Sequence, residues 1–296
     1  ARTGRVDIVD VPGMQFLGTG WIVEKKADDV AIVVTNRHVA AEFARADGRG
    51  GFNFLTAPNY RSYEAEVGFV REHESRPGDQ KQARVDRVLY IAANTDPDIA
   101  LLRVSGEHLR GLDALEPWTN PMAPELEVGV IGYPAYDSRN DDAAVARYFG
   151  GIFNVKRFAF GEISSVSDRH PEFTHDATTL GGNSGSCVFE LATGKVVGLH
   201  FAGTFRTANY AVPIEQVTRA LAGLTTTAVV RRDDGEAISD GVKPVEFYEG
   251  RDGYDPEFLG KNSKRVELPG LGTKWKADAA SVKDADTGKK VRVLKY

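Results

Sequence analysis

The stretch "TTLGGNSGSCVF", residues 178–189, places three nucleophilic side chains, Ser184, Ser186 and Cys187, within four consecutive positions. Glycines surround them at 181, 182 and 185. Small residues gather like this where the backbone turns sharply and closely approaches another group. A glycine-rich turn that presents a serine is typical of a site of nucleophilic attack.

A catalytic serine in a glycine-rich turn occurs in two known settings. The elbow of an α/β-hydrolase needs Gly-x-Ser-x-Gly, but Ser186 occupies the place of the last glycine and no strand–helix alternation surrounds the motif. That setting is excluded. The other setting needs a histidine and an aspartate upstream, in the order His, Asp, Ser.

A histidine and an aspartate that could act with the serine each lie next to a predicted strand. His38 ends the strand-like run "AIVVTNRHVA", and Asp98 opens the buried-type strand "DIALLRV". Histidine titrates near neutral pH, so it can take the serine proton and return it to the leaving amine. A carboxylate orients the imidazole and stabilises its charged form. Asp96 competes for that role, and Asp98 is preferred because it directly precedes "IALL".

Three blocks in this order, "TNRHVA" (35–40), "DIALL" (98–102) and "GGNSGS" (181–186), resemble the signature blocks of trypsin-like serine proteases, which have the chymotrypsin fold. The strands "GTGWIV" (18–23) and "GLHFAG" (198–203) also resemble that family, over about residues 14–222. The resemblance implies His38 as general base, Asp98 as its orienting acid and Ser184 as nucleophile.

The same resemblance implies an oxyanion hole formed by the backbone N–H groups of Gly182 and Ser184. Ser186 is expected to face the core or to bond the backbone. Cys187 begins an apolar strand and is expected to be a small buried hydrophobe. No cofactor is implied, and the remaining histidines show no metal-ligand spacing and are expected at the surface: His73, His108, His170 and His175.

Asn183 departs from the digestive members of the family. Those proteases carry an aspartate before the serine, which pairs with a newly freed N-terminus on activation. An asparagine cannot form this ion pair, so activation by N-terminal insertion is not expected.

The substrate pocket resembles that of the bacterial glutamyl endopeptidases. His200 in "GLHFAGT" and Thr179 match the pair that holds the substrate glutamate in those enzymes, and Gly203 would leave room for an extended peptide. A hydroxyl and an imidazole suit a half-buried carboxylate. The structural alternative is a core histidine on an apolar strand.

Short apolar runs and many turn signals predict an all-β fold. With the resemblance, we expect two six-stranded antiparallel β-barrels, at about 14–114 and 125–212, and a C-terminal helix at 213–224. Together they form a protease domain over 1–224. Residues 141–149 predict a short helix, and "LEPWTNPMAP" (115–124) predicts a connector between the halves.

Residues 225–296 are rich in charge, glycine and proline, and predict an extended arm or a linker to a further domain, with one terminal strand in 289–296. The part "GRDGYDPEFLG…VELPGL" weakly resembles the segment before the core of bacterial DNA/RNA non-specific endonucleases. It suggests the protease part of a protease–nuclease defence protein. Five aromatic residues are expected to anchor the arm: Phe247, Tyr248, Tyr254, Phe258 and Trp275.

The 296 residues carry a net charge of −5, which does not favour direct binding of nucleic acid. No apolar run reaches the length of a membrane span, and the start lacks the apolar core of a signal peptide. A single cysteine excludes an internal disulfide. A cytoplasmic protein acting on protein or peptide substrates is expected.

The leading hypothesis is a serine endopeptidase that cleaves after acidic residues, chiefly Glu. One alternative is an HtrA-like regulatory protease with a preference for small apolar P1 residues, although no PDZ-like domain follows residue 224. The other is a catalytically silent protease fold that serves as a binding module.

Overall fold

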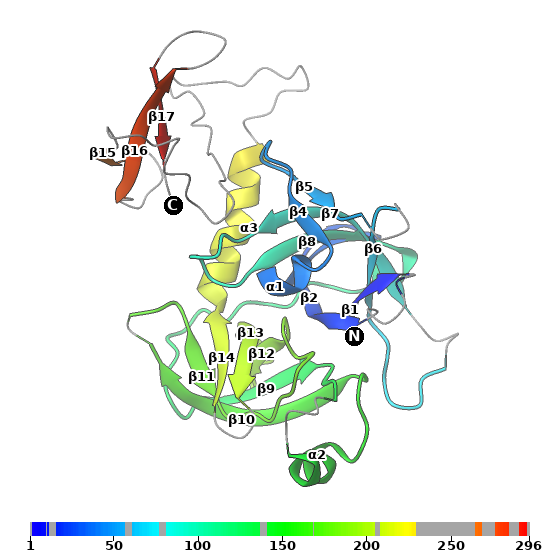
Figure 1. The fold of residues 1–296 in the computed structure, drawn as a ribbon. Coiled ribbons are helices and arrows are strands. Elements are labelled where there is room, and N and C mark those ends of the chain that lie inside the picture. The colour runs from blue at the N-terminus through cyan, green and yellow to red at the C-terminus, as the bar shows by residue number, and fades with distance from the viewer. Residues whose placement is uncertain are drawn as a thin grey trace. The chain divides into compact units, whose positions relative to one another are not determined.

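The structure is a computed structural model that describes residues 2–9, 11, 16–56, 61–76, 81–136, 141–167, 169–204, 208–228, 264–267, 276–283 and 290–294. The chain forms two compact units, Ala1–Val229 and Val230–Tyr296 (Figure 1). The first unit contains two closed six-stranded antiparallel barrels, so the predicted all-β, chymotrypsin-like class is confirmed. Among the described residues, no helix is both long and apolar enough to cross a membrane.

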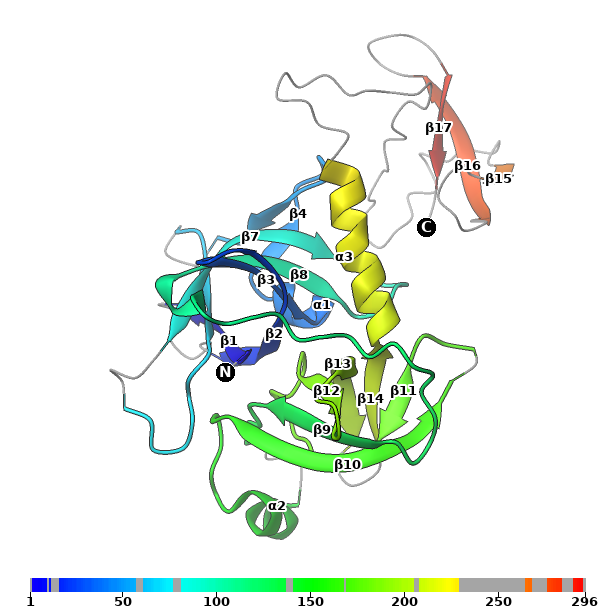
Figure 2. The ribbon, with the colours of Figure 1, turned by 180° about the vertical axis from the view of Figure 1, so that it is seen from behind.

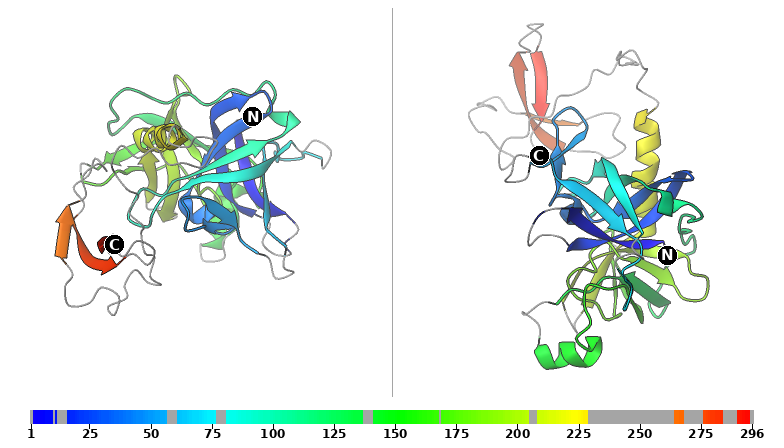
Figure 3. Two further views of the ribbon diagram at one scale, coloured as in Figure 1. Left: turned by 90° about the horizontal axis from the view of Figure 1, so that it is seen from above. Right: turned by 90° about the vertical axis from the view of Figure 1, so that its right-hand side faces the viewer.

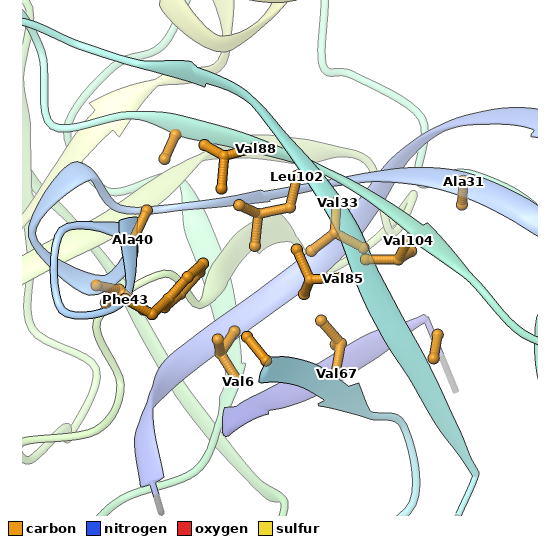
Figure 4. Packing of buried hydrophobic residues seen from close by; sticks show 14 of the residues in the cluster. Val6, Ala31, Val33, Ala40, Phe43, Val67, Val85, Val88, Leu102 and Val104 are labelled. Carbon is orange, nitrogen blue, oxygen red and sulfur yellow. The ribbon is translucent and has the colours of Figure 1, made fainter. Parts of the chain in front are cut away.

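The first barrel has the strand order β1-β2-β3-β8-β7-β6. Its strands are β1 (Thr3–Val9), β2 (Phe16–Ala27), β3 (Val30–Thr35), β6 (Glu64–Gly68), β7 (Gln82–Ile91) and β8 (Ala100–Ser105). Aliphatic side chains from all six strands fill it, among them Val6, Val33, Val67, Val85 and Leu102 (Figure 4). Two short strands, β4 (Ala44–Ala46) and β5 (Phe52–Phe54), form a separate ribbon.

Strand β1 lies outside the predicted bounds of the first barrel, 14–114, which were therefore too narrow at the N-terminal side. Its sequence "TGRVDIV" contains two charged residues, yet Arg5 and Asp7 are 7% and 3% exposed. They are buried because they pair with each other, Arg5 Nε lying 2.9 Å from Asp7 Oδ1. Residues 5–8 alternate between charged and apolar side chains, as in a strand with one face in water, and the sequence does not show that the charged face is buried as well.

The second barrel has the strand order β10-β11-β14-β13-β12-β9. Its strands are β9 (Glu127–Gly132), β10 (Arg157–Val166), β11 (Phe173–His175), β12 (Cys187–Glu190), β13 (Val196–Thr204) and β14 (Ala208–Pro213). The predicted short helix is present as α2 (Asp142–Phe149), before β10. The right-hand view of Figure 3 shows the two barrels stacked on each other.

A shared apolar cluster joins the barrels. Trp21 and Leu101 of the first barrel pack with Cys187, Leu199 and Val212 of the second. Helix α3 (Ile214–Ala228) follows β14 directly and adds Val217 to this cluster, four residues longer than predicted at its C-terminal end. Pro213 precedes its first turn, where a missing N–H leaves no helical bond unmade.

The connector between the barrels crosses the back of the first unit (Figure 2). It begins after β8 with the 3₁₀ helix η2 (Glu107–Leu109). The Leu115 N–H donates to the carbonyl of Ile22 in β2, and the Trp118 N–H donates to that of Val196 in β13. It is therefore bonded to each barrel in turn.

The second unit differs from the extended arm expected from the sequence. It contains a three-stranded antiparallel sheet with the order β15-β16-β17, from strands β15 (Lys264–Glu267), β16 (Lys276–Lys283) and β17 (Lys290–Leu294). Strand β17 falls in the predicted terminal strand. Strands β15 and β16 were not predicted, because lysine stands at the ends of the strands and the sequence of β16, "KADAASVK", is only weakly apolar. The five expected aromatic anchors lie outside the described residues.

Candidate active site

His38 lies in α1 (Arg37–Ala40), the single turn that follows β3. The buried Asn36 caps this turn in an extended conformation, and its amide Nδ2 donates to the Asp98 carbonyl oxygen at 2.8 Å. That bond ties the start of the helix to the segment before β8. It therefore brings the predicted base and the predicted acid to one place.

Both oxygens of Asp98 face His38. Oδ2 lies 2.6 Å from His38 Nδ1, and Oδ1 accepts the His38 backbone N–H at 3.1 Å. The Asp98 side chain is 12% exposed, and that of His38 is 47% exposed. Burial tends to raise the pKa of Asp98, but the hydrogen bonds and charge of His38, with the nearby Arg37, outweigh it and lower that pKa. The carboxylate therefore stays charged beside the imidazole.

Asp96, the competing acid, does not contact the imidazole in any interaction of the described residues. Its backbone carbonyl accepts from Arg37 Nη1 at 3.3 Å. The geometry thus joins His38 to Asp98 and leaves Asp96 as part of the supporting loop.

Ser184 is held beside the histidine through β2. Its carbonyl accepts the Thr19 N–H at 2.7 Å. A Cβ atom built on Gly18 would lie 2.8 Å from Val39 Cγ2 and 2.9 Å from the Ser184 carbonyl oxygen. Val39, the residue after His38, and the backbone of Ser184 therefore both pack against Gly18. No residue with a side chain would fit at position 18.

The Ser184 hydroxyl points toward β13 in this structure, with Oγ 3.5 Å from the Phe201 carbonyl oxygen. No hydrogen bond of the described residues joins it to His38. Catalytic hydrogen bonds are often long or misaligned in a free enzyme and tighten when substrate binds.

The predicted oxyanion-hole residues have the backbone geometry for that role. Gly182 has φ of +87°, and a Cβ there would lie 2.4 Å from the Tyr133 carbonyl oxygen. Only glycine fits such a position. The carbonyl of Gly181 accepts from Ala135 at 2.7 Å, and that of Asn183 accepts from Ser186 at 2.9 Å.

Each of these carbonyls shares a peptide group with a predicted oxyanion donor. Because a trans peptide places N–H opposite C=O, the N–H groups of Gly182 and Ser184 point to the other side. Both donors are left without an acceptor among the described residues, which is one requirement of the predicted oxyanion hole.

The two other nucleophiles of the turn are buried. Ser186 is 0% exposed, with its hydroxyl 3.5 Å from Asn183 Oδ1. Cys187 is 1% exposed, and its sulfur lies 3.4 Å from Thr3 Oγ1. Burial raises the pKa of the Cys187 thiol, which keeps it in its unreactive protonated form.

A second histidine lies behind His200, and the expectation that His175 is at the surface is wrong. His175 is 0% exposed and His200 is 3% exposed, and His175 Nε2 lies 3.2 Å from His200 Nδ1. Desolvation lowers the pKa of His175 to about 4 and lowers that of His200 well below its usual value. The Gly185 N–H donates to the His200 carbonyl at 2.8 Å, and the His200 N–H donates to the Ser186 carbonyl at 2.9 Å, so the pair lies beside the turn that carries Ser184.

Thr179 and Gly203 meet at a residue that sequence reasoning missed, Asn209 on β14. The Thr179 hydroxyl donates to Asn209 Oδ1, while Asn209 Nδ2 donates to the Ala177 carbonyl oxygen at 2.8 Å. A Cβ on Gly203 would lie 2.2 Å from Asn209 Oδ1. The sequence signal for Asn209 was weak: it is a polar residue directly before the apolar run "YAVPI" (210–214).

Residues 18–199 match the family model of the trypsin-like peptidase domain. The chain belongs to this family. The match begins at the glycine beside Ser184 and ends one residue before His200. The matched range thus contains His38, Asp98 and Ser184, and it ends before the predicted pocket residues His200 and Gly203.

The chain is also similar to one curated protein and to solved structures. The chain is 25% identical over 261 residues to a probable serine protease of Lysobacter enzymogenes, covering 76% of this chain and 62% of the relative. The chain therefore spans less than two thirds of that curated relative. The serine endoprotease from Yersinia pestis has a similar fold, with a TM-score of 0.50, 17% identity, and coverage of 77% of this chain and 64% of that one. Deg5 aligns with a TM-score of 0.48 and 20% identity, over 74% of this chain and 86% of its own.

The buried histidines predict that the trypsin-like domain loses stability as the pH falls from 6.5 toward 4. In this range the unfolded chain binds a proton at His175 that the folded chain, with a pKa of about 4, does not bind. The free energy of unfolding therefore falls with pH, by about 3 kcal/mol for this group alone. Urea denaturation at pH 7 and pH 4.5, on protein carrying Ser184→Ala to prevent self-cleavage, measures the loss.

His175→Gln should reduce that pH dependence. The matched control is His73→Gln, because the His73 side chain is 57% exposed. Equal pH dependence in the His175→Gln and His73→Gln proteins would show that the buried histidine does not cause it.

Proposed function

We propose that this chain is a serine endopeptidase in which Ser184 attacks the peptide bond, His38 transfers the proton and Asp98 orients His38. The observation that carries the proposal is the 2.6 Å contact of His38 Nδ1 with Asp98 Oδ2, next to a serine whose backbone is fixed on β2. Asp98 accepts the Nδ1 proton, so Nε2 of the neutral imidazole is free to accept the serine proton.

In the first step Ser184 Oγ bonds to the scissile carbonyl carbon, and its proton moves to His38 Nε2. The carbonyl oxygen becomes an anion facing the N–H groups of Gly182 and Ser184. The C–N bond then breaks, and His38 returns the proton to the leaving amine. Water repeats the sequence on the acyl-enzyme, with His38 again accepting and then donating a proton, so the enzyme is regenerated.

The substrate backbone would bind along β13. One edge of this strand pairs with β12 as far as Leu199. The last backbone hydrogen bonds on this edge join His200 to Gly185 and Ser186. Beyond it, β13 pairs with β14 on the other edge only, through Ala202↔Tyr210 and Gly203↔Asn209. Among the described residues the first edge is open there. An extended peptide can add to it as a strand.

We further propose a preference for glutamate at P1, with His200 as the main donor. His175 Nδ1 is buried and has no hydrogen-bond partner among the described residues, whereas its Nε2 contacts His200. A neutral imidazole has one proton, and placing it on Nδ1 would leave a buried donor unsatisfied. His175 therefore donates from Nε2 to His200 Nδ1. The proton of His200 is then on Nε2, available to a substrate carboxylate.

The Thr179 hydroxyl is already engaged in a hydrogen bond, which limits its part in binding the substrate glutamate. Its only hydroxyl proton is donated to Asn209 Oδ1. Since Asn209 Nδ2 is bonded to the Ala177 carbonyl, the amide cannot turn to release that oxygen without losing a buried bond. Thr179 can bind a carboxylate only if its hydroxyl turns away from Asn209. His200 is thus expected to contribute more to glutamate binding than Thr179.

A peptide library varied at P1 tests the specificity. We expect cleavage chiefly after Glu and more weakly after Asp. His200→Ala should lower kcat/KM for a Glu substrate by roughly 10–100-fold, the usual effect of a hydrogen bond to a charged group, and change apolar substrates much less. His170→Ala, at an exposed position, is the matched control. Cleavage after small apolar residues would favour an HtrA-like protease, and cleavage after Lys or Arg would contradict the pocket.

A fluorophosphonate probe tests the class of protein. Labelling confined to Ser184, and lost in Ser184→Ala, supports the peptidase. A protein that no condition renders reactive would be a silent protease fold acting as a binding module.

We also propose that the chain is the protease part of a longer polypeptide, fused to a nuclease and acting in bacterial defence. Support comes from the sequence resemblance in residues 225–296. A protease with glutamate preference could release such a domain by cleaving after Glu246, Glu249, Glu257 or Glu267. Mass spectrometry of the full polypeptide should show cleavage with Ser184 and none with Ser184→Ala. An intact linker in both would exclude self-release.

A further inference from the structure

The loop that carries the oxyanion-hole donors has no charged residue at 183 to hold it. The Asn183 amide donates from Nδ2 to the Leu180 carbonyl oxygen at 3.1 Å, within the same loop. Its Oδ1 contacts the Ser186 hydroxyl, also within the loop. Contacts from outside must therefore orient the peptide between Gly181 and Gly182, whose N–H is one of the two donors.

The first outside contact is the ring of Phe16, at the start of β2. A Cβ on Gly182 would lie 2.7 Å from both Cε1 and Cζ of that ring. The Arg5 guanidinium lies over the ring, 5.0 Å from its centroid. A cation over an aromatic face is attracted to it. Arg5 therefore holds the ring against Gly182.

The second contact is a chain of hydrogen bonds that also begins at Arg5. Arg5 Nη1 donates to the Asn154 carbonyl oxygen at 3.2 Å. The Asn154 N–H donates to the Pro134 carbonyl oxygen at 2.8 Å, and the next residue, Ala135, donates to the Gly181 carbonyl oxygen at 2.7 Å. This last bond fixes the peptide that carries the Gly182 N–H.

Arg5 is itself fixed by a buried carboxylate. Its Nε lies 2.9 Å from Asp7 Oδ1, and Arg71 Nη2 lies 3.2 Å from Asp7 Oδ2. Arg5 and Asp7 belong to the first barrel, whereas Asn154, Pro134 and Gly182 belong to the part of the chain that builds the second. The ion pair thus links the two barrels directly behind the oxyanion hole.

We propose that Arg5, held by Asp7, is a positioning residue that keeps the Gly182 N–H directed into the oxyanion hole, through the Phe16 ring and through Asn154. This inference rests on the proposed peptidase function. Its consequence is that the hole is held by an ion pair already inside the folded chain. No newly freed N-terminus is then needed to form it.

Three variants test the role: Phe16→Leu, Arg5→Lys, and the double variant Arg5→Met with Asp7→Asn. The double variant avoids a buried carboxylate that has lost Arg5, which would destabilise the fold. Phe16→Leu leaves the ion pair intact. Active-site titration with a fluorophosphonate to its end point counts the folded sites, so each constant refers to competent enzyme only.

We expect kcat per titrated site to fall by about 10-fold or more in Phe16→Leu and in the double variant. The upper limit is the roughly 10²–10³-fold loss of kcat that is typical when one oxyanion donor is removed. The affinity for a peptide aldehyde, whose tetrahedral adduct places an oxygen in the hole, should fall by the same factor. KM should change by less than about threefold, because the substrate carbonyl gains these bonds mainly in the transition state. Arg5→Lys keeps the charge and should lie between wild type and the double variant.

The matched control is Arg103→Met, which breaks an exposed ion pair with Asp86 on the same barrel and should change none of these values. Unchanged kcat and aldehyde affinity per site in Phe16→Leu and in the double variant would overturn the positioning role, even if both proteins melted earlier. A wild-type chain that neither reacts with the probe nor cleaves any peptide would overturn the proposed function instead, and the inference with it.

Discussion

Replacing Ser184 with alanine is expected to lower kcat by about 10⁴–10⁶, the range typical of losing a triad nucleophile. The hydroxyl is the only candidate that combines partial exposure with a place beside His38, because Ser186 and Cys187 are buried. Removing it leaves the oxyanion donors and the substrate strand unchanged. Residual activity should therefore come from binding and electrostatics alone. Initial rates on a Glu peptide, with circular dichroism to confirm folding, measure the effect.

Ser186→Ala and Cys187→Ala are the matched controls, since they lie two and three residues away on the same turn. Ser186→Ala removes a buried hydroxyl that lies 3.5 Å from Asn183 Oδ1, and Cys187→Ala removes a buried thiol that contacts Thr3 Oγ1 at 3.4 Å and the backbone of Ile131. We expect both to retain activity within severalfold. Full activity of Ser184→Ala, or loss of activity in Cys187→Ala alone, would contradict the assignment of the nucleophile.

Asp98→Asn is expected to lower kcat by about 10⁴ at neutral pH. Asp98 Oδ2 accepts the proton on His38 Nδ1 across 2.6 Å, and Oδ1 accepts the His38 backbone N–H. An amide can keep the backbone bond with its oxygen only by turning its NH₂ group toward Nδ1. The imidazole then carries its proton on Nε2 and cannot accept one from Ser184.

Asp96→Asn is the control for this prediction, because the hydrogen bonds described for Asp96 are made by its backbone: its carbonyl accepts from Arg37 and its N–H donates to Ala93. It should retain activity within severalfold. Comparison of kcat for both variants between pH 6 and pH 10 separates a wrong tautomer from a collapsed site. If Asp96→Asn were the more damaged of the two, the acid would have been assigned to the wrong residue.

Each residue of the predicted triad lies in a local segment that has its own pattern, so the sequence alone was enough to propose it. His38 follows an apolar strand, Asp98 precedes one, and Ser184 stands in a glycine-rich turn. Short-range sequence determines such segments, and the order of the three blocks is visible along the chain. The barrel class followed from the same short apolar runs, and the helix expected at 213–224, observed at Ile214–Ala228, followed from a proline at its start and a glycine near its end.

The second unit shows the opposite case. Strands β15 and β16 are short and carry lysine at their ends, and they become strands by pairing with each other and with β17. Propensity for a strand depends on its neighbours in the sheet more than on its own residues. The composition of residues 225–296 predicted a linker because it contains no local sign of that pairing.

The sequence by itself determined the order His38, Asp98, Ser184 and the two-barrel class, since local patterns are enough for both. Only the tertiary structure decided what surrounds them. His175 stands in a three-residue strand among polar residues, and it is buried because β11 is paired on both edges within a closed barrel and its ring lies against His200 and Phe173. Arg5 and Asp7 have the composition of a surface strand, yet they are buried because each supplies the charge that the other lacks. Burial of a polar group depends on a partner supplied by the fold, which in the case of His175 is His200, 25 residues further along the chain.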